Sequence, residues 1–320
     1  MTRGRGWAAA LVALGLSAGC GERVPEQTAP EAPPPVAPAP ALSPPGTQPV
    51  LPRSAASVAL ADFYGRLQAD LLSRGLLRGD GGGADAPYTD VMLARDFVRI
   101  ALYDEYAPGA PGGTAGPVMS RLRRWEGPVR MDVRFGATVP QDRQLQDRAM
   151  ISAYAARLSR IIGLPVTQTE TGANFHVFVV NEDDRRGLSD TLRRIAPGIA
   201  DSTVSTILNM PRSTLCMVAA FSEGGSPVYT RAIVVIRAEH PDLLRTACVH
   251  EELAQGLGLA NDHPQARPSI FNDDEEFALL TGHDEMLLKI LYDRRLTPGM
   301  TPVEAAPVVN RIAAELLEGS

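Results

Sequence analysis

The chain has 320 residues, of which 44% are hydrophobic and 21% charged, a composition typical of a globular protein. Its 37 acidic and 31 basic residues give a formal net charge of −6. Nucleic-acid binding depends on a concentrated basic surface, and the sequence contains no such cluster. We therefore expect no nucleic-acid partner.

Residues 1–19 are predicted to be an export signal. Arg3 and Arg5 precede an apolar stretch, residues 7–16, that is shorter than the ~20 residues of a membrane-spanning helix. The sequence LSAGC, which ends at Cys20, resembles the lipobox of bacterial lipoproteins. The resemblance implies a lipidated, palmitate-bearing Cys20. Because Gly21 follows, it also implies an outer-membrane anchor facing the periplasm. A plain secretory signal is the alternative.

Residues 20–53 are predicted to form a tether behind this anchor. Eleven of the 27 prolines lie between Pro25 and Pro52. Such a density favours extended polyproline II, which rises ~3.1 Å per residue and buries no core. A ligand for a proline-binding module is the alternative. With Cys20 lipidated, Cys216 and Cys248 remain as an even pair in an oxidising compartment, which predicts a disulfide rather than two buried thiols.

The rest of the chain is predicted to be an α/β (α+β) protein. Residues 54–124 form an N-terminal helical and loop lobe, with a helix over 58–77 and a strand or short helix over 96–106. The main domain spans residues 125–300, and residues 301–320 form a C-terminal helix. Periodicity within the main domain predicts strands near 131–135 and over 175–180, 215–221 and 229–237, and helices over 142–162, 188–195 and 241–258.

The last of these helices carries the most unusual polar residues, HEELAQGLGLAND over 250–262. The two-histidine zinc motif His-Glu-x-x-His needs a histidine where Ala254 stands. One residue later, EELAQGLGLAND resembles the metzincin motif His-Glu-x-x-His-x-x-Gly-x-x-His/Asp. The resemblance puts Glu252 at the general base and Gly258 at the turn. The three metal-ligand positions are occupied by Glu251, Gln255 and Asn261.

Downstream segments extend the resemblance. RPSIFN over 267–272 is similar to the metzincin Met-turn, with Phe271 in place of methionine, and DEMLLKILY over 284–292 is similar to the helix that follows it. These matches imply a metzincin-like fold with a mixed sheet, a long backing helix and an active-site-type helix. At closer range, HEELAQGLGLAND, PSIFNDD and LYDRRLTPGM resemble the proteobacterial domain of unknown function 2927, a family of proposed lipoproteins without an established activity.

The chemistry of these residues predicts a degenerate site. Zinc prefers imidazole and thiolate, whereas Glu251, Gln255 and Asn261 offer one carboxylate and two amides. We therefore expect no cofactor and no catalysis, and a hydrogen-bonded network with Asp262 and the region of Asn272 in place of the metal. In the alternative, a metallohydrolase binds zinc or another divalent cation at a nonstandard site around Glu251 and Glu252, with auxiliary groups His250 and Asp262 and, if the chain folds back after Gly258, His263 and His283.

Other polar residues are predicted to be structural. The four acids over 273–276 suit the positive end of a helix, with calcium binding as the alternative. His176 and His240 are expected in a strand and at a helix entry.

The function expected from these features is binding. A groove beside a sheet edge suits an extended peptide or an envelope protein, bound by β-augmentation. A metallohydrolase and a purely structural envelope module are the alternatives.

Overall fold

The computed structural model describes residues 51–104, 118–272 and 274–319, which belong to one compact unit, Thr47–Ser320. The predicted signal, Cys20 and nearly all of the predicted tether lie outside the described residues. Within the described ranges, no helix combines the length and apolar character needed to cross a bilayer.

A five-stranded mixed sheet forms the centre of the unit, in the order β4-β3-β5-β7-β6. Four strands are parallel, and β6 at one edge runs antiparallel to β7. Parallel strands are stable only when both faces are covered, which explains the nearly continuous apolar sequences of β5 and β7. The strands are β3 (Val129–Phe135), β4 (Val166–Gln168), β5 (Phe175–Val180), β6 (Cys216–Ser222) and β7 (Tyr229–Arg237). The predicted α/β class and mixed sheet are confirmed.

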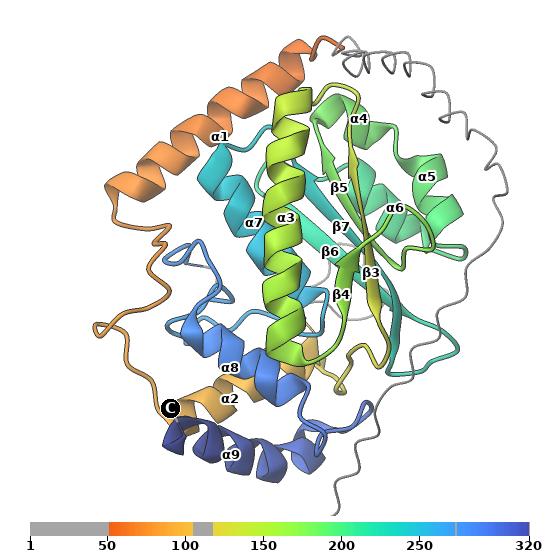
Figure 1. Cartoon of the computed structure of the whole chain (residues 1–320). Coiled ribbons are helices and arrows are strands. Elements are labelled where there is room, and N and C mark those ends of the chain that lie inside the picture. Colours follow the sequence, from red (N-terminus) through yellow and green to blue (C-terminus); the bar gives the residue numbers. More distant parts are fainter. Residues whose placement is uncertain (1–50, 105–117, 273, 320) are drawn as a thin grey trace, which may run out of the picture. The chain divides into compact units, whose positions relative to one another are not determined.

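Helices cover both faces of this sheet (Figure 1). Alternate residues of each strand face opposite sides, so Val177 and Val179 enter the larger core while Phe178 and Val180 enter the smaller one. Helices on the larger side are α3 (Gln141–Ile162), α7 (Asp242–Gln255) and α8 (Gly282–Leu291). The other side carries α4 (Glu182–Arg186), α5 (Ser189–Ile195) and α6 (Asp201–Leu208).

The terminal helices of the described region join the same unit. Helix α1 (Ala55–Ser73), capped by Ser54, buries Tyr64 and Leu71 against Leu244 and Ala247 of α7. Helix α2 (Asp90–Ala101) packs against α9 (Pro302–Glu318) and shares the large core. Strands β1 (Tyr103–Asp104) and β2 (Val118–Met119) form a separate two-stranded sheet. Elements from all three predicted segments of the globular part therefore lie in one compact unit.

Several predicted elements differ from those observed. The segment predicted as a strand or short helix over 96–106 begins as α2 at Asp90 and continues into β1. Neither β4 nor α6 was predicted from the sequence. Helix α7 ends at Gln255 rather than Gly258, and Gly258 has a φ of 130°. A Cβ at Gly258 would overlap the carbonyl oxygen of Arg123, so this turn requires glycine for both its backbone angle and its close packing.

Gly258→Ala is expected to lower the free energy of unfolding by about 3 kcal/mol, because it adds both φ strain and steric overlap. Urea denaturation measures the loss. The matched control is Gly282→Ala at the first position of α8, where a Cβ meets no atom within 4 Å and φ is not positive. Equal stabilities for the two variants would contradict this account of the turn.

Candidate functional site

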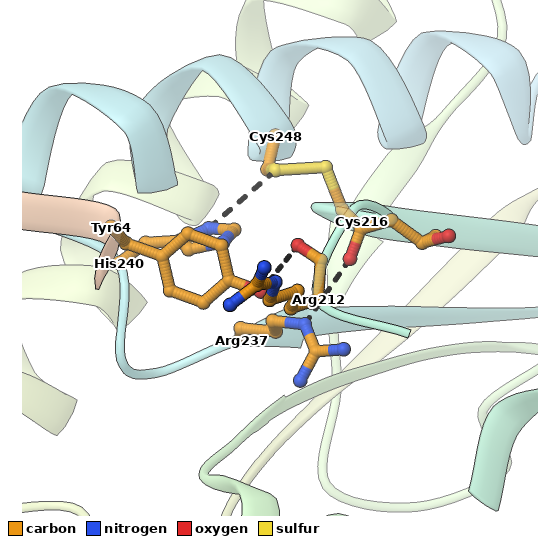
Figure 2. The surroundings of a disulfide bond; sticks show 7 residues. Tyr64, Arg212, Cys216, Arg237, His240 and Cys248 are labelled. Carbon is orange, nitrogen blue, oxygen red and sulfur yellow. Dashed lines mark hydrogen bonds between the residues drawn. A yellow bond between two sulfur atoms is a disulfide. The ribbon is translucent and has the colours of Figure 1, made fainter. Parts of the chain in front are cut away.

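A disulfide connects the edge strand to the polar helix. Cys216 at the start of β6 and Cys248 in the middle of α7 are bonded, with a Cα–Cα distance of 5.8 Å, as predicted. Figure 2 shows Tyr64 and His240 beside this bond, with His240 Nδ1 3.7 Å from Cys248 Sγ. The rings of Tyr64 and His240 meet edge to face at 4.4 Å. Helix α1 therefore helps to enclose the covalent link between β6 and α7.

The backbone of β6 has an outward-facing side at the edge of the sheet. The N–H group of Ala232 in β7 donates to the carbonyl oxygen of Asn174, just before β5. The N–H group of Ala238, just after β7, donates to the carbonyl oxygen of Val180 in β5. Backbone groups of successive residues in a strand point to alternate sides. The N–H and C=O groups of the odd-numbered residues of β7 therefore point toward β6. Given the register, Met217 and Ala219 exchange the ladder hydrogen bonds. The outward-facing backbone groups are those of Cys216, Val218 and Ala220, and no backbone bond from the described chain reaches them.

Two carboxylates of α7 lie close to this edge. Glu251 and Glu252 each have an oxygen within 4.8 Å of the other and of Cys216 Sγ. Glu252 is buried and Glu251 is half-buried. The sulfur belongs to the disulfide and is not a thiolate, so this group supplies two carboxyl groups but no anionic sulfur. The helix thus places two carboxyl groups beside the start of β6.

The other two predicted ligand positions have different partners. Gln255 Nε2 lies 3.4 Å from Asp262 Oδ1. Asn261 is buried, and its amide nitrogen donates to the carbonyl oxygen of Arg99 at the end of α2, 3.0 Å away. Its backbone N–H donates to Ile100. The chain therefore brings Glu251 and Glu252 together, and Gln255 and Asp262 together, while the side chain of Asn261 bonds to α2.

His250 has a position in the core. Leu280 N donates to its Nδ1 at 3.0 Å, and its ring stacks on Tyr154 with a centroid distance of 3.9 Å. The Tyr154 hydroxyl donates to the backbone oxygen of His250. Burial, together with the charge of Arg157, lowers the pKa of His250 to about 3. His250 is therefore neutral near pH 7 and links α7 to α3 and to the segment before α8.

The turn that resembles a Met-turn is held by one buried carboxylate. Asp284 in the first turn of α8 accepts hydrogen bonds from Ser269 Oγ (2.6 Å), Ile270 N (3.2 Å) and Thr281 N (3.0 Å). Phe271 is fully buried in the large core. The capping box of Thr281 and Asp284 thus fixes both the start of α8 and the turn before it.

The acidic run has a different role from the one predicted. No helix begins over 274–276, because Glu275 has a φ of 57°, so the helix-start prediction is wrong. Glu276 pairs instead with Arg78 at 3.0 Å and Arg267 at 2.7 Å, which lowers its pKa despite partial burial. Asp273 lies outside the described residues.

The remaining histidines pack against other polar groups. His176 in β5 lies 3.7 Å from Asp132, and burial lowers its pKa. His263 and His283 approach Asp96 of α2. The alternative that grouped His263 and His283 around Glu251 and Glu252 did not include Asp96, which comes from a separate segment that no local sequence pattern connects to them. The outward-facing backbone of β6 was likewise hidden, since an edge strand has no distinct residue pattern here.

The described unit is thus a mixed α/β domain whose antiparallel edge strand is joined by a disulfide to a polar helix. The family model "Protein of unknown function (DUF2927)" matches residues 90–311, more than half of the chain, and the chain belongs to this family. No match was found among the curated proteins or among the solved structures.

Stability is expected to fall in acid partly because of His250. The unfolded histidine takes up a proton below about pH 6.5, whereas the folded one stays neutral down to about pH 3. The stability supplied by neutral His250 is present above the unfolded pKa and is lost as pH falls toward the folded pKa, by about 1.4 kcal/mol per pH unit between pH 6 and 4.

The test compares urea unfolding of the wild type with that of His250→Gln at pH 7, 6, 5 and 4. Glutamine retains an acceptor for Leu280 N but does not titrate. The stability difference between the two proteins should change with pH in favour of the variant as pH falls. Parallel curves would rule out a titration effect of His250.

Proposed function

We propose that this protein binds an extended peptide, or an extended segment of an envelope protein, along the outer edge of β6. The observation that carries the proposal is the row of outward-facing backbone groups at Cys216, Val218 and Ala220. An exposed strand edge readily pairs with another chain. The disulfide holds this edge in place beside α7, so a ligand meets a preorganised strand.

The charge beside the edge supports a preference for basic ligands. Glu251 and Glu252 gather next to Cys216, and the chain as a whole carries a net charge of −6. Complementary charge raises association rates and discriminates against acidic partners. An extended peptide with arginine or lysine on the side facing α7 therefore suits the site best.

We also infer a metzincin-like origin for this scaffold. The order of strands, the long helix α3 and the polar helix α7 agree with the order that a zincin N-terminal lobe requires. The segments around Gly258 and Phe271 support the same relation. With no histidine at the ligand positions and Asn261 bonded to α2, we expect the scaffold to act by binding rather than by hydrolysis.

Lipid anchoring completes the proposed role. The LSAGC sequence and the proline-rich stretch up to Pro52 support a domain tethered by Cys20 to the periplasmic face of the outer membrane. A tether of roughly 30 residues at ~3.1 Å each reaches up to ~90 Å from the bilayer. The domain can then meet ligands across much of the periplasm.

Val218→Pro is expected to weaken peptide binding at least ten-fold (~1.4 kcal/mol). Proline removes an N–H that faces outward and leaves the ladder to β7 unbroken. Fluorescence anisotropy measures binding to a labelled ten-residue peptide of alternating valine and arginine. Threonine–valine and glutamate–valine peptides serve as neutral and acidic comparisons.

Val218→Thr, which keeps the N–H, should bind like the wild type. Glu252→Gln should retain the ligand and lose only part of the preference for the basic peptide. Equal affinity of Val218→Pro and wild type for the basic peptide would refute pairing at this edge. Metal-dependent peptide cleavage that Glu252→Gln abolishes would favour the metallohydrolase instead.

Cys20→Ser is expected to release the protein from the membrane fraction. The serine cannot receive a thioether-linked lipid, so radiolabelled palmitate should label the wild type and not the variant. Fractionation of bacteria expressing each form tests this outcome. A membrane-bound, unlabelled wild type would contradict lipid anchoring.

A further inference from the structure

A second polar cluster lies in the core, apart from the edge of β6. Asp96 comes from α2, His263 from the loop after α7, and His283 from α8. Asp96 and His283 are fully buried, and the side chain of His263 is 15% exposed. Three separate segments thus place two imidazoles beside the two oxygens of one carboxylate.

Several polar atoms of this cluster have no hydrogen-bond partner among the described residues. His283 Nε2 lies 3.3 Å from Asp96 Oδ2, and His263 Nε2 lies 3.7 Å from Asp96 Oδ1. Asp96 Oδ2 and both Nε2 atoms are buried and have no hydrogen-bond partner in the described structure. Burying such atoms without partners costs several kcal/mol in an apolar environment, so a cluster of three points to a bound species.

We propose that Asp96, His263 and His283 bind a divalent transition-metal ion of the zinc class. Two imidazoles and one carboxylate are preferred ligands of these ions. Ligands ~2.05 Å from a tetrahedral ion lie ~3.3 Å apart, which matches the separation of His283 Nε2 and Asp96 Oδ2.

The surroundings resemble the outer shell of a metal site. Asp284 Oδ1 lies 3.8 Å from His283 Nδ1, on the opposite side of the ring from Asp96. Arg95 Nε donates to Asp96 Oδ1 at 2.8 Å and leaves Oδ2 for the ion. Second carboxylates on ligand histidines and hydrogen bonds to ligand carboxylates are general features of such sites.

Metal binding requires the side chain of His263 to move. The three ligand atoms are less closely grouped than those of Cys216, Glu251 and Glu252, so the partly exposed His263 ring must turn toward Asp96 Oδ2. Its backbone is held by the hydrogen bond from His263 N to Phe271 O.

An ion at this position would cross-link α2, the loop after α7 and α8. These elements support the turn at Ser269 and the loop after α7, where Asn261 bonds to α2. The ion is therefore structural, and it is independent of peptide binding at β6.

Titration of the full, disulfide-bonded protein with Co²⁺ tests the proposal. The expected result is one equivalent of Co²⁺ with visible d–d absorption, displaced by Zn²⁺, and a higher melting temperature. His263→Ala, at the exposed side of the cluster, should weaken binding at least ~10-fold and remove most of the melting-temperature increase. His283→Gln should do the same, provided that circular dichroism shows it to be folded.

Two controls separate this cluster from other groups. Glu251→Gln removes a carboxylate near the disulfide, and His176→Ala removes a histidine that pairs with a different aspartate, so both should bind Co²⁺ like the wild type. No Co²⁺ binding by the wild type, which would leave a buried water or a protonated His283 as the occupant, overturns the proposal. Binding retained in His263→Ala, or lost in Glu251→Gln, overturns it as well.

Discussion

The covalent bond between Cys216 and Cys248 is the constraint on which the arrangement of the site depends. A strand at the edge of a sheet has neighbours on one side only, and without other support it frays or pairs with another chain. The disulfide fixes the start of β6 to the middle of α7, and α1 covers this link through Tyr64. The carboxylates of Glu251 and Glu252 are thereby held at the same end of the edge strand.

The polar residues around α7 show how a helix with charged and amide side chains is accommodated in a core. Each buried group must find a partner, and these partners come from distant segments. His250 accepts from Leu280 N, Asn261 donates to the carbonyl oxygen of Arg99, and Asp284 holds the turn around Ser269. Together these bonds connect α2, α7 and α8 without requiring an ion at the metzincin-like positions.

Strong local patterns in the sequence predicted much of the fold. The apolar runs of β5 and β7 and the periodicity of α3 located these elements almost to the residue, and counting cysteines predicted the disulfide. Local signals failed where tertiary contacts decide. Strand β4 has three residues and exists through pairing with β3, and α7 ends at Gln255, before a turn in which Gly258 fits closely against the backbone of Arg123.

The sequence by itself determined the α/β class, the family and the absence of histidines from the metzincin-like ligand positions, because periodicity and motif spacing are local properties of the chain. Only the tertiary structure decided that Asn261 bonds to α2 and that Val218 faces outward. It alone brings Asp96, His263 and His283 together as well. These outcomes depend on strand register and on packing between segments as much as 187 residues apart in the numbering (283 − 96 = 187), which no local pattern encodes.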